Sequence, residues 1–287
     1  MKILLTGSSG MLGSEVYAEL KRKKHEIIEY DYTKGKDILN EKQLEESMKS
    51  ASAVIHLAGL IDGTKEDLRK INIEGTRRVV NTAKKLKVKK FVFMSSTGVY
   101  GFTNGKVNEK SKINPENEYE KSKAEGEKIV LESGLDACIV RGAIILGANN
   151  YWKKMFEMLK KKLPLPCSGT NKFQIIYSKE LARAIVLVLK KGKKGEIYLA
   201  AGNEKPTLNE FCEMAQEELK LEKRVKHIPA KVAILAGKIF GIKVLTNENI
   251  RHLSKERDYD TRKIQKLGWK EKKKIRQALR ETIKELK

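Results

Sequence analysis

The 287-residue sequence has little cysteine, proline and tryptophan and lacks any long hydrophobic run. Its three cysteines (Cys138, Cys167 and Cys212) are too few and too widely spaced for a disulfide framework, and with four scattered histidines they give no metal-ligand cluster. We therefore expect no metal. No apolar run reaches the roughly 20 residues of a membrane helix, and no cleavage-site pattern follows the apolar stretch in MKILLTGSSG. These absences predict a cytoplasmic protein without a membrane segment.

Charge of one sign is abundant, since 60 Lys and Arg stand against 37 Asp and Glu for a net charge of +23. Such an excess fits either a polyanionic partner or the Lys- and Glu-rich surface that thermophile proteins show. The lysines are spread through the chain without aromatic residues between them, which favours a solvated surface. We predict no nucleic-acid partner, although the charge would attract an anionic small substrate.

The first half of the chain alternates short apolar segments with amphipathic ones. This alternation predicts βαβ units and a doubly wound parallel sheet of the α/β Rossmann class, with a smaller carboxyl-terminal α/β substrate subdomain. The expected strands are 2–7, 25–31, 52–59, 90–96 and 136–142, and the expected helices are 11–24, 41–50, 71–87 and 119–134. The predicted dinucleotide-binding domain is 1–142 with about 173–202, and the predicted substrate-binding subdomain is about 143–172 with 203–287.

The second half shows a looser pattern. We expect helices at 151–162 and 179–192 and strands at 174–178 and 195–202. Thr207 and Glu210 have the spacing of a capping box before an apolar-periodic helix. Segment 230–245 is apolar but interrupted by lysines, which fits an amphipathic helix that packs on the subdomain or one that lies on a membrane surface.

A glycine-rich loop, TGSSGMLG, directly follows the first expected strand and opens a helix. Gly7, Gly10 and Gly13 permit a tight turn and close approach of the backbone to a pyrophosphate, which the helix amino terminus would attract. Asp31 ends the next strand, near the roughly 20-residue offset expected for a carboxylate that accepts ribose hydroxyls. A carboxylate there would repel a 2′-phosphate, so we predict NAD over NADP, although Lys34 and Lys36 are close by.

Tyr119 and Lys123 in YEKSK are four residues apart and therefore share one helix face, while Glu120 and Lys121 are expected to face elsewhere. In a lysine-rich helix this spacing also arises by chance. A nearby ammonium and a positive nicotinamide ring would favour the phenolate and lower the pKa of Tyr119. The glycine loop and Asp31 favour the catalytic interpretation.

Together these motifs resemble the extended short-chain dehydrogenase/reductase family of the NAD-dependent epimerase/dehydratase type, and UDP-glucose 4-epimerases in particular. The resemblance is dense over about residues 1–145 and rests on TGSSGMLG, DILNE, HLAGLI, INIEGTRRVV, SSTGVYG and YEKSK. It implies Ser96, Tyr119 and Lys123 as catalytic residues. The residues it implies at the cofactor are Gly7, Gly10, Met11, Leu12, Gly13, Asp31, Tyr32, Lys34, Lys36, Asp37, Ile38, Leu57, Ala58, Gly59, Leu60, Asn72, Tyr119, Lys123 and Ala143.

The residues around the catalytic serine narrow the reaction. Dehydratases of the resembled family carry an acid between the serine and the Val-Tyr-Gly sequence, where this chain has Thr97 and Gly98, so an epimerase, reductase or dehydrogenase is favoured. Phe173 stands about where the resemblance would place an arginine for the substrate diphosphate, with Lys172 beside it. The expected substrate-binding residues are Ser96, Thr97, Tyr119 and Lys172, whereas Arg141, Tyr151 and Trp152 fit either a structural or a pocket role.

Three functions follow as hypotheses. The first is an NAD-dependent nucleotide-sugar epimerase or related sugar oxidoreductase that uses hydride transfer at a Ser-Tyr-Lys site. The second, motivated by the missing arginine, is an NAD(P)-dependent reductase or dehydrogenase of a non-nucleotide hydroxy or keto compound, similar to dihydroflavonol reductases and hydroxysteroid dehydrogenases. The third is a non-catalytic dinucleotide-binding scaffold. By analogy with the family, we expect a homodimer through helices 71–87 and 119–134.

Overall fold

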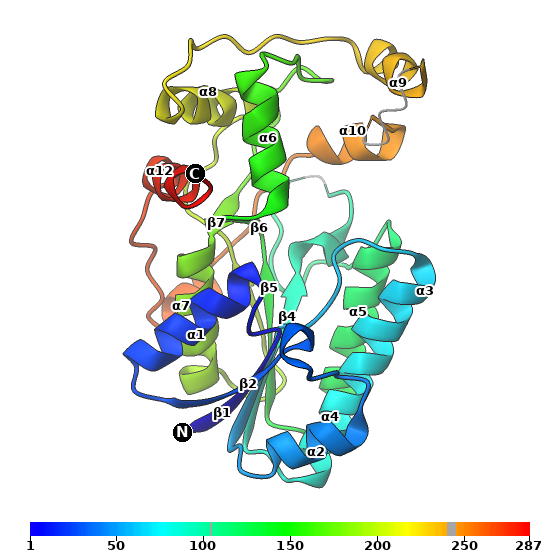
Figure 1. Ribbon diagram of the computed structural model, residues 1–287, viewed down its shortest axis with the longest axis vertical. Coiled ribbons are helices and arrows are strands. Elements are labelled where there is room, and N and C mark those ends of the chain that lie inside the picture. Colours follow the sequence, from blue (N-terminus) through cyan, green and yellow to red (C-terminus); the bar gives the residue numbers. More distant parts are fainter. Residues whose placement is uncertain (104, 240–244) are drawn as a thin grey trace.

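A parallel sheet of six strands forms the centre of the larger part of the molecule (Figure 1). The computed structural model describes residues 1–103, 105–239 and 245–287. The sheet has the order β2-β1-β3-β4-β5-β8, and every neighbouring pair is parallel. Its strands are β1 (Lys2–Thr6), β2 (Glu26–Tyr30), β3 (Ala53–His56), β4 (Lys90–Ser96), β5 (Ala137–Gly142) and β8 (Ile197–Ala200). The predicted fold class is confirmed.

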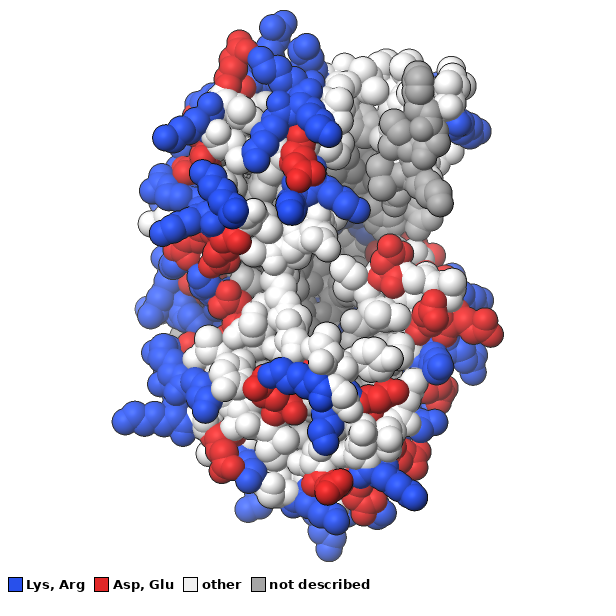
Figure 2. Space-filling model, in the orientation of Figure 1, with Lys and Arg blue, Asp and Glu red and all other residues white. Residues whose placement is uncertain are grey.

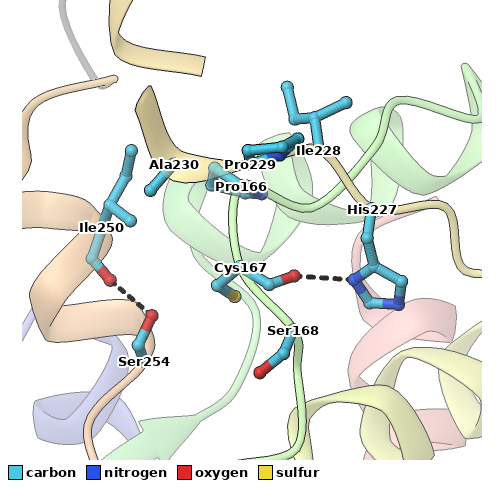
Figure 3. Close-up of a pocket in the computed structure, with 9 residues that line it drawn as sticks. All are labelled: Pro166, Cys167, Ser168, His227, Ile228, Pro229, Ala230, Ile250 and Ser254. Carbon is cyan, nitrogen blue, oxygen red and sulfur yellow. Dashed lines mark hydrogen bonds between the residues drawn. The ribbon is translucent and has the colours of Figure 1, made fainter. Parts of the chain in front are cut away.

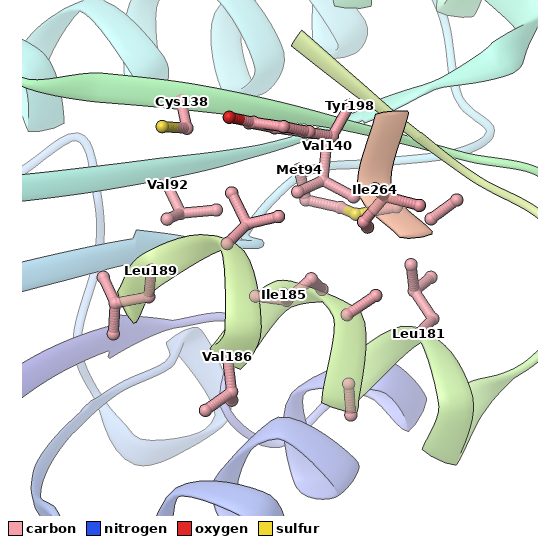
Figure 4. Packing of buried hydrophobic residues seen from close by; sticks show 14 of the residues in the cluster. Val92, Met94, Cys138, Val140, Leu181, Ile185, Val186, Leu189, Tyr198 and Ile264 are labelled. Atoms are coloured by element: carbon pink, nitrogen blue, oxygen red, sulfur yellow. The ribbon is translucent and has the colours of Figure 1, made fainter. Parts of the chain in front are cut away.

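Helices cover both faces of this sheet, which explains why its strands read as nearly continuous apolar runs (Figure 1). One face carries α1 (Met11–Arg22) and α7 (Ser178–Lys191), and the other carries α2 (Glu41–Met48), α4 (Thr76–Lys85) and α5 (Glu118–Glu132). On α7, Leu181, Ile185 and Leu189 recur at a spacing of four residues and form one buried stripe. Figure 4 shows this stripe packed against the labelled strand residues, Val92, Met94, Cys138, Val140 and Tyr198.

β1 lies between β2 and β3, so the chain adds β2 on one side of β1 and then crosses to add β3 on the other side. In the register of these strands, Leu4 pairs with Ile28 on one side and with Val54 on the other. Loops that leave the carboxyl ends of β1 and β3 therefore part to opposite faces and leave a crevice, where open α/β sheets bind their ligands. The glycine loop follows β1 directly, so the fold places it at this crevice.

A smaller part of the molecule packs around its own apolar cluster beyond the carboxyl edge of the sheet (Figure 1). Its elements are β6 (Ile144–Leu146), β7 (Ile175–Tyr177), α6 (Asn150–Lys160), α8 (Leu208–Glu218), α9 (Ala230–Ile239), α10 (Asn247–Leu253) and α12 (Ile275–Glu285). The predicted capping box is confirmed, because the Glu210 N–H donates to Thr207 Oγ1 and the Thr207 N–H donates to Glu210 Oε2. The predicted strand at 174–178 pairs with β6 and not with the central sheet.

Several short elements escaped the sequence patterns. They are β6, α10, α3 (Lys65–Leu68), α11 (Arg262–Lys266), the 3-10 turns Tyr32–Lys34 and Thr97–Tyr100 and the π-helix Arg69–Gly75. Of the predicted helix 230–245, residues 230–239 form α9, and residues 240–244 lie outside the described part of the chain. None of the helices among the described residues is long and apolar enough to cross a membrane. The division of the chain into two domains at the predicted boundaries stays a prediction.

Candidate functional site

Two of the three glycines in the turn between β1 and α1, Gly7 and Gly13, could not be replaced by larger residues without a change of backbone. Gly7 has a φ of +69°, and its N–H donates to the Tyr30 carbonyl at 2.9 Å. A Cβ on Gly13 would lie 1.9 Å from the Gly7 carbonyl oxygen, whereas one on Gly10 would meet that oxygen at 3.5 Å, an ordinary contact. Gly13 is thus required by the turn itself, and Gly10 leaves open space above it.

The amino terminus of α1 is not capped by a side chain. Gly10 occupies the cap position, and no acidic residue lies in the first turn, so the first N–H groups face outward beside Met11 and Leu12 without an internal acceptor. Ser8 Oγ is buried and has no hydrogen-bond partner among the described residues. An uncapped helix terminus with an unpaired hydroxyl fits the pyrophosphate of a dinucleotide.

Asp31 lies at the end of β2, next to this loop. Its Oδ2 accepts the Ser9 N–H at 2.9 Å, and its Oδ1 accepts both the N–H and the hydroxyl of Thr33. Burial acts to raise the pKa of Asp31, but the hydrogen bonds from Thr33 and Ser9 outweigh it and lower that pKa. An ionised carboxylate therefore lies beside the glycine loop, where a ribose would need an acceptor.

The other predicted residues of the adenosine side differ in exposure and pairing. Tyr32 is 80% exposed, Lys34 forms an ion pair with Glu29 at 2.5 Å, and Asp37 Oδ1 accepts the Leu39 N–H at 2.8 Å. Lys36 is half-buried and Ile38 is buried. Because Lys34 already has a carboxylate partner, Asp31 dominates the charge at the ribose position.

Asn72 ties the loop after β3 to α5. Its Oδ1 accepts the Leu60 N–H at 2.7 Å, and its Nδ2 donates to the Leu60 carbonyl and to Ser122 Oγ, each at 2.9 Å. The residue lies in the π-helix Arg69–Gly75, and such distortions of a helix are frequent at functional sites. Asn72 thus holds Leu60 and lies against Gly59, whereas Thr6 Oγ1 accepts the N–H groups of Leu57 and Ala58 at 3.1 Å each.

Ser96, Tyr119 and Lys123 meet at the carboxyl end of β4. Ser96 lies close enough to Tyr119 to lower the pKa of its hydroxyl, and Lys123 Nζ donates to the Met94 carbonyl at 3.0 Å. A Cβ on Gly59 would lie 3.4 Å from Lys123 Nζ, so the amine lies against the loop that Asn72 holds. The structure therefore brings the three predicted catalytic residues together beside the predicted cofactor loop.

The electrostatics of this trio differ from the expectation for Tyr119. Burial raises the pKa of Tyr119, the hydrogen bond from Ser96 lowers it, and the charge of Glu120 raises it further. Burial also lowers the pKa of Lys123 to about 8, against the opposing charge of Glu127. Lys123 is not among the groups that shift the pKa of Tyr119, because its Nζ is directed to Met94. The lowered pKa expected for Tyr119 is thus absent from the protein alone.

The remaining predicted residues frame the space above β4 and β5. The Ala143 N–H donates to the Ala200 carbonyl at 2.9 Å, and the side chain of Ala143 is buried. Thr97 is buried and lies close enough to Tyr259 to lower the pKa of its hydroxyl against the effect of burial. Trp152 is a core residue, whereas Tyr151 is 59% exposed. Of that aromatic pair, only Tyr151 is available to a ligand.

Arg141 is structural. Its guanidinium forms two hydrogen bonds with Glu127, at 2.8 and 2.6 Å, and donates a third to the Tyr100 hydroxyl at 2.6 Å. Arg141 and Glu127 are each 3% exposed, so neither charge is available to a substrate. This arrangement resolves the two roles that the sequence left open for Arg141.

Phe173 and Lys172 occupy the positions where the family resemblance predicts an arginine that binds the substrate diphosphate. Phe173 is buried against Phe211, with ring centroids 5.6 Å apart, and Lys172 is exposed with its charge felt by Glu210. The backbone of Phe173 forms a bridge with Arg257, whose N–H donates to the Lys172 carbonyl at 3.0 Å. An arginine therefore lies beside this position, but it comes from a segment 84 residues further along the chain.

The sequence patterns did not identify Arg257 as a site residue. Its guanidinium donates to the carbonyls of Lys255 and His252, at 3.0 and 2.8 Å, and no carboxylate of the described residues lies within ion-pair distance of it. Burial lowers the pKa of Arg257, while Tyr259, Tyr151 and Glu120 raise it. Arg257 is thus a cation that pairs with no carboxylate of the described residues and that interacts electrostatically with Glu120 on α5. The motif RDYD, 257–260, was the available signal, but it lies in a segment without periodicity.

A pocket of about 520 Å³ lies on the smaller part of the molecule (Figure 3), and one of its lining residues, Ser254, is three positions before Arg257 in the chain. Pro166, Ile228 and Pro229 form apolar walls, and His227 Nδ1 is hydrogen-bonded to the Cys167 carbonyl at 2.7 Å. The remaining residues that line the pocket are Ser168, Ala230 and Ile250. Flat apolar walls with a few fixed polar groups suit a planar ring.

Two links connect the pocket to Arg257 and Arg257 to the catalytic trio. Ser254 lines the pocket and lies between His252 and Lys255, whose carbonyls hold the Arg257 guanidinium. Arg257 in turn interacts electrostatically with Glu120, which follows Tyr119 on α5. Figure 2 shows a hollow in the middle of the molecule that is surrounded mainly by uncharged atoms, while Lys and Arg gather toward the outline.

Comparison with known proteins decides the family. A model described as the NAD dependent epimerase/dehydratase family matches residues 3–201, which is more than half of the chain. The chain belongs to this family. The predicted resemblance and enzyme class are thereby confirmed, and the family is NAD dependent, as predicted for the cofactor.

Curated relatives of this epimerase/dehydratase family member include sugar-modifying enzymes. It is 29% identical over 249 residues to a dTDP-D-glucose 4,6-dehydratase of Dictyostelium discoideum, covering 69% of this chain and 57% of that protein. It is 26% identical over 269 residues to the N-acetyl-alpha-D-glucosaminyl-diphospho-ditrans,octacis-undecaprenol 4-epimerase of Escherichia coli O157:H7, covering 84% and 79%. The chain spans 65%, 57% and 33% of the first three curated relatives.

The fold matches solved members as well. The UDP-glucuronic acid 4-epimerase from Bacillus cereus, solved in complex with NAD, superposes with a TM-score of 0.82 over 100% of this chain and 99% of that one, at 20% identity. At this identity the match concerns the fold, and it extends through both parts of the molecule.

Proposed function

We propose that this protein is an NAD-dependent nucleotide-sugar epimerase or closely related sugar oxidoreductase. The observation that carries the proposal is the combination of the pocket lined by Pro166, His227 and Ser254, the Arg257 guanidinium, which pairs with no carboxylate of the described residues, and the Ser96-Tyr119-Lys123 trio. A nucleoside diphosphate sugar has a planar base, a dianionic diphosphate and a hydroxylated ring in the same order. The family assignment and its sugar-modifying relatives support this substrate class.

The glycine loop and its neighbours would hold the dinucleotide. The uncapped terminus of α1 with Ser8 Oγ would take the pyrophosphate, Asp31 the adenosine ribose, and Lys123 the ribose on the nicotinamide side. Bound NAD would accept a hydride from a carbon of the sugar and return it.

The chain's own residues would handle the proton and the oxygen. Tyr119 would take the proton from the sugar hydroxyl as the hydride leaves the same carbon, and Ser96 would donate a hydrogen bond to the oxygen as a carbonyl forms. Because burial raises the pKa of Tyr119 in the protein alone, the phenolate would have to be favoured by charges that arrive with the ligands.

Arg257 would bind the diphosphate. A guanidinium presents a planar fork of donors that matches phosphate oxygens, and two of its N–H groups are already oriented by backbone carbonyls. The alternative of an apolar hydroxy or keto substrate was motivated by the missing arginine, and Arg257 would supply that cation from another segment of the chain. Lys172, which was expected to bind substrate, stays a candidate for a weaker role at the exposed edge.

The test is proton NMR of UDP-glucose and UDP-galactose incubated with the protein and NAD, beside Tyr119→Phe. The proposal expects interconversion that falls by about 100-fold or more in the variant, since a positioned proton-transfer group contributes that much. If neither these sugars nor a panel of other UDP- and dTDP-sugars is converted, the nucleotide-sugar assignment is wrong.

A further inference from the structure

A buried carboxylate lies beside the catalytic trio and has no role in the hydride-transfer scheme. Glu120 follows Tyr119 on α5, and it was expected to face away from the site. The structure corrects this expectation, because Glu120 is only 5% exposed and its side chain runs toward the turn that follows β4. A buried carboxylate needs a reason, since burial of this charge is costly.

The absence of a side chain at residue 98 makes room for this carboxylate. A Cβ built on Gly98 would lie 3.0 Å from Glu120 Cγ, 3.2 Å from Glu120 Oε1 and 3.2 Å from Ser96 Oγ. One point is therefore within contact distance of both the Glu120 carboxylate and the catalytic serine hydroxyl. Glu120 thus fills the space where a residue on the serine's own turn would otherwise project.

The carboxylate is held at one oxygen. Oε2 accepts the Glu116 N–H at 2.8 Å, and among the described residues no other donor to the Glu120 carboxylate is found. Asn117 caps the helix and fixes its first turn, because its Oδ1 accepts the Glu120 N–H at 2.8 Å. The capped first turn of α5 therefore fixes the position of Glu120, and Oε1 accepts no hydrogen bond from the described residues.

The groups around Glu120 also point to the reaction space. Its charge raises the pKa of Tyr119, of Tyr259 and of Arg257, so Glu120 lies within electrostatic reach of both the trio and the proposed diphosphate site. Lys255 is buried and is affected by the same carboxylate, but the two form no ion pair within 4 Å in the described part of the chain. Among the described residues, the Glu120 carboxylate thus forms no structural salt bridge of the kind that Glu127 forms with Arg141.

We propose that Glu120 is a further catalytic residue, an acid and base that moves the proton on the carbon next to the oxidised carbon of the sugar. The inference rests on the proposed function, because that proton becomes acidic only beside a keto group. Glu120 Oε1 would take the proton as the C–H electron pair forms the enolate double bond. Ser96 and the protonated Tyr119 would hold the enolate oxygen, and return of a proton from Glu120 would restore the keto sugar.

Such a step gives the enzyme an activity beyond hydride transfer. Proton return from Glu120 would exchange the hydrogen on the neighbouring carbon with solvent, and the enolate is also the species from which a leaving group one carbon further on is expelled. The chemical class of the reaction is therefore proton abstraction α to a carbonyl, which hydride transfer alone does not include.

The experiment uses UDP-4-keto-6-deoxyglucose in D₂O, because this probe carries the keto group from the start and needs no hydride transfer. Proton NMR would follow the loss of the signals at the carbons beside the keto group. The proposal expects the full chain to exchange one of these protons well above the spontaneous rate and Glu120→Gln to lower the enzymatic rate by about 100-fold. Glu118→Gln is the matched control, since Glu118 lies on the same helix but is paired with Lys121 at the surface.

A wild-type protein that exchanges no faster than the buffer, or a Glu120→Gln variant that exchanges as fast as wild type, would overturn the inference. Thermal unfolding of each variant excludes loss of the fold, and Glu120→Asp, which keeps the acid but shortens it, should retain a measurable part of the rate. Failure of the proposed function is seen separately. Exchange of the keto probe without conversion of UDP-glucose counts against hydride transfer, and conversion of UDP-glucose without exchange counts against Glu120.

Discussion

At the residue scale, Arg257 and Lys172 make a matched pair of cations that differ in placement. Arg257 is half-buried beside the pocket, with two N–H groups held by backbone carbonyls, whereas Lys172 is exposed. Arg257→Ala should raise the KM for a nucleotide sugar by about 10- to 100-fold with a smaller effect on kcat, because a hydrogen bond to a charged group contributes about 1.5–3 kcal/mol. Steady-state kinetics measures this change.

Lys172→Ala is the control for that measurement, and it should alter KM by no more than about threefold, since exposed charge pairs contribute little. A Lys172 variant that loses more affinity than the Arg257 variant would move the diphosphate site to the exposed edge of the cleft. The affinity for NAD should be the same in both variants.

Arg141 offers a second prediction at this scale. Its ion pair with Glu127 is almost wholly buried, so Arg141→Met would leave the Glu127 carboxylate uncompensated and should lower the free energy of unfolding by about 3–5 kcal/mol. The double variant Arg141→Met, Glu127→Leu should recover most of this loss, because neither charge remains. Urea unfolding of the three proteins tests it, and a single variant within about 1 kcal/mol of wild type would contradict it.

At the scale of elements, the turn between β1 and α1 separates the needs of folding from those of binding. Gly13→Ala should lower the melting temperature, because its Cβ would meet the Gly7 carbonyl oxygen at 1.9 Å. Gly10→Ala should leave the melting temperature close to that of wild type. It should lower the affinity for NAD, since the added Cβ would occupy the space above the helix terminus. Thermal unfolding and NAD titration distinguish them. Equal melting temperatures for both variants would show that the turn is not built as described.

His56 predicts how the stability of the β1-β3 pair depends on pH. The ring is fully buried between Thr6 and Thr76, which are 2.7 and 3.0 Å away, and burial lowers its pKa to about 3. Below pH ~6.5 His56 binds a proton in the unfolded chain, whereas in the folded protein it stays neutral until about pH 3. Stability is therefore full above pH ~6.5 and falls as the pH is lowered, by about 2 kcal/mol at pH 5.

The measurement for His56 is the free energy of unfolding at pH 7 and pH 5 for wild type and His56→Asn. The variant should be less stable at pH 7 but should lose less stability between the two values, by about 2 kcal/mol. Parallel losses in the two proteins would mean that the ring is already charged or solvated in the folded state.

At the scale of the whole molecule, local patterns predicted the Rossmann sheet and the trio but not the rest of the cleft. Tyr119 and Lys123 share a helix face by their spacing alone, and Ser96 ends a strand that the apolar pattern defines. Arg257 reaches the site through a backbone bridge to Phe173, and Glu120 turns inward because Gly98 leaves room for it. Contacts of this kind depend on segments that meet only after folding, so no periodicity in the sequence signals them.

The surface charge of the whole molecule agrees with a solvated exterior. Lys and Arg gather toward the outline of the visible face, where Asp and Glu lie among them (Figure 2). Several form ion pairs, such as Lys179 with Glu281 and Glu285 at 3.4 and 2.8 Å. The predicted homodimer through α4 and α5 stays a prediction, for which the molar mass in solution is the measurement.

The central claim is that the trio takes the proton from one hydroxyl of a nucleotide sugar while the carbon that bears this hydroxyl loses a hydride to NAD. Its most direct test is the absorbance at 340 nm after the protein with NAD is mixed with UDP-glucose, compared with UDP-glucose deuterated at C4. The account predicts a rise in absorbance that is slower with the deuterated sugar and absent in Tyr119→Phe. A protein that binds NAD but gives no rise with this or any other nucleotide sugar would contradict it.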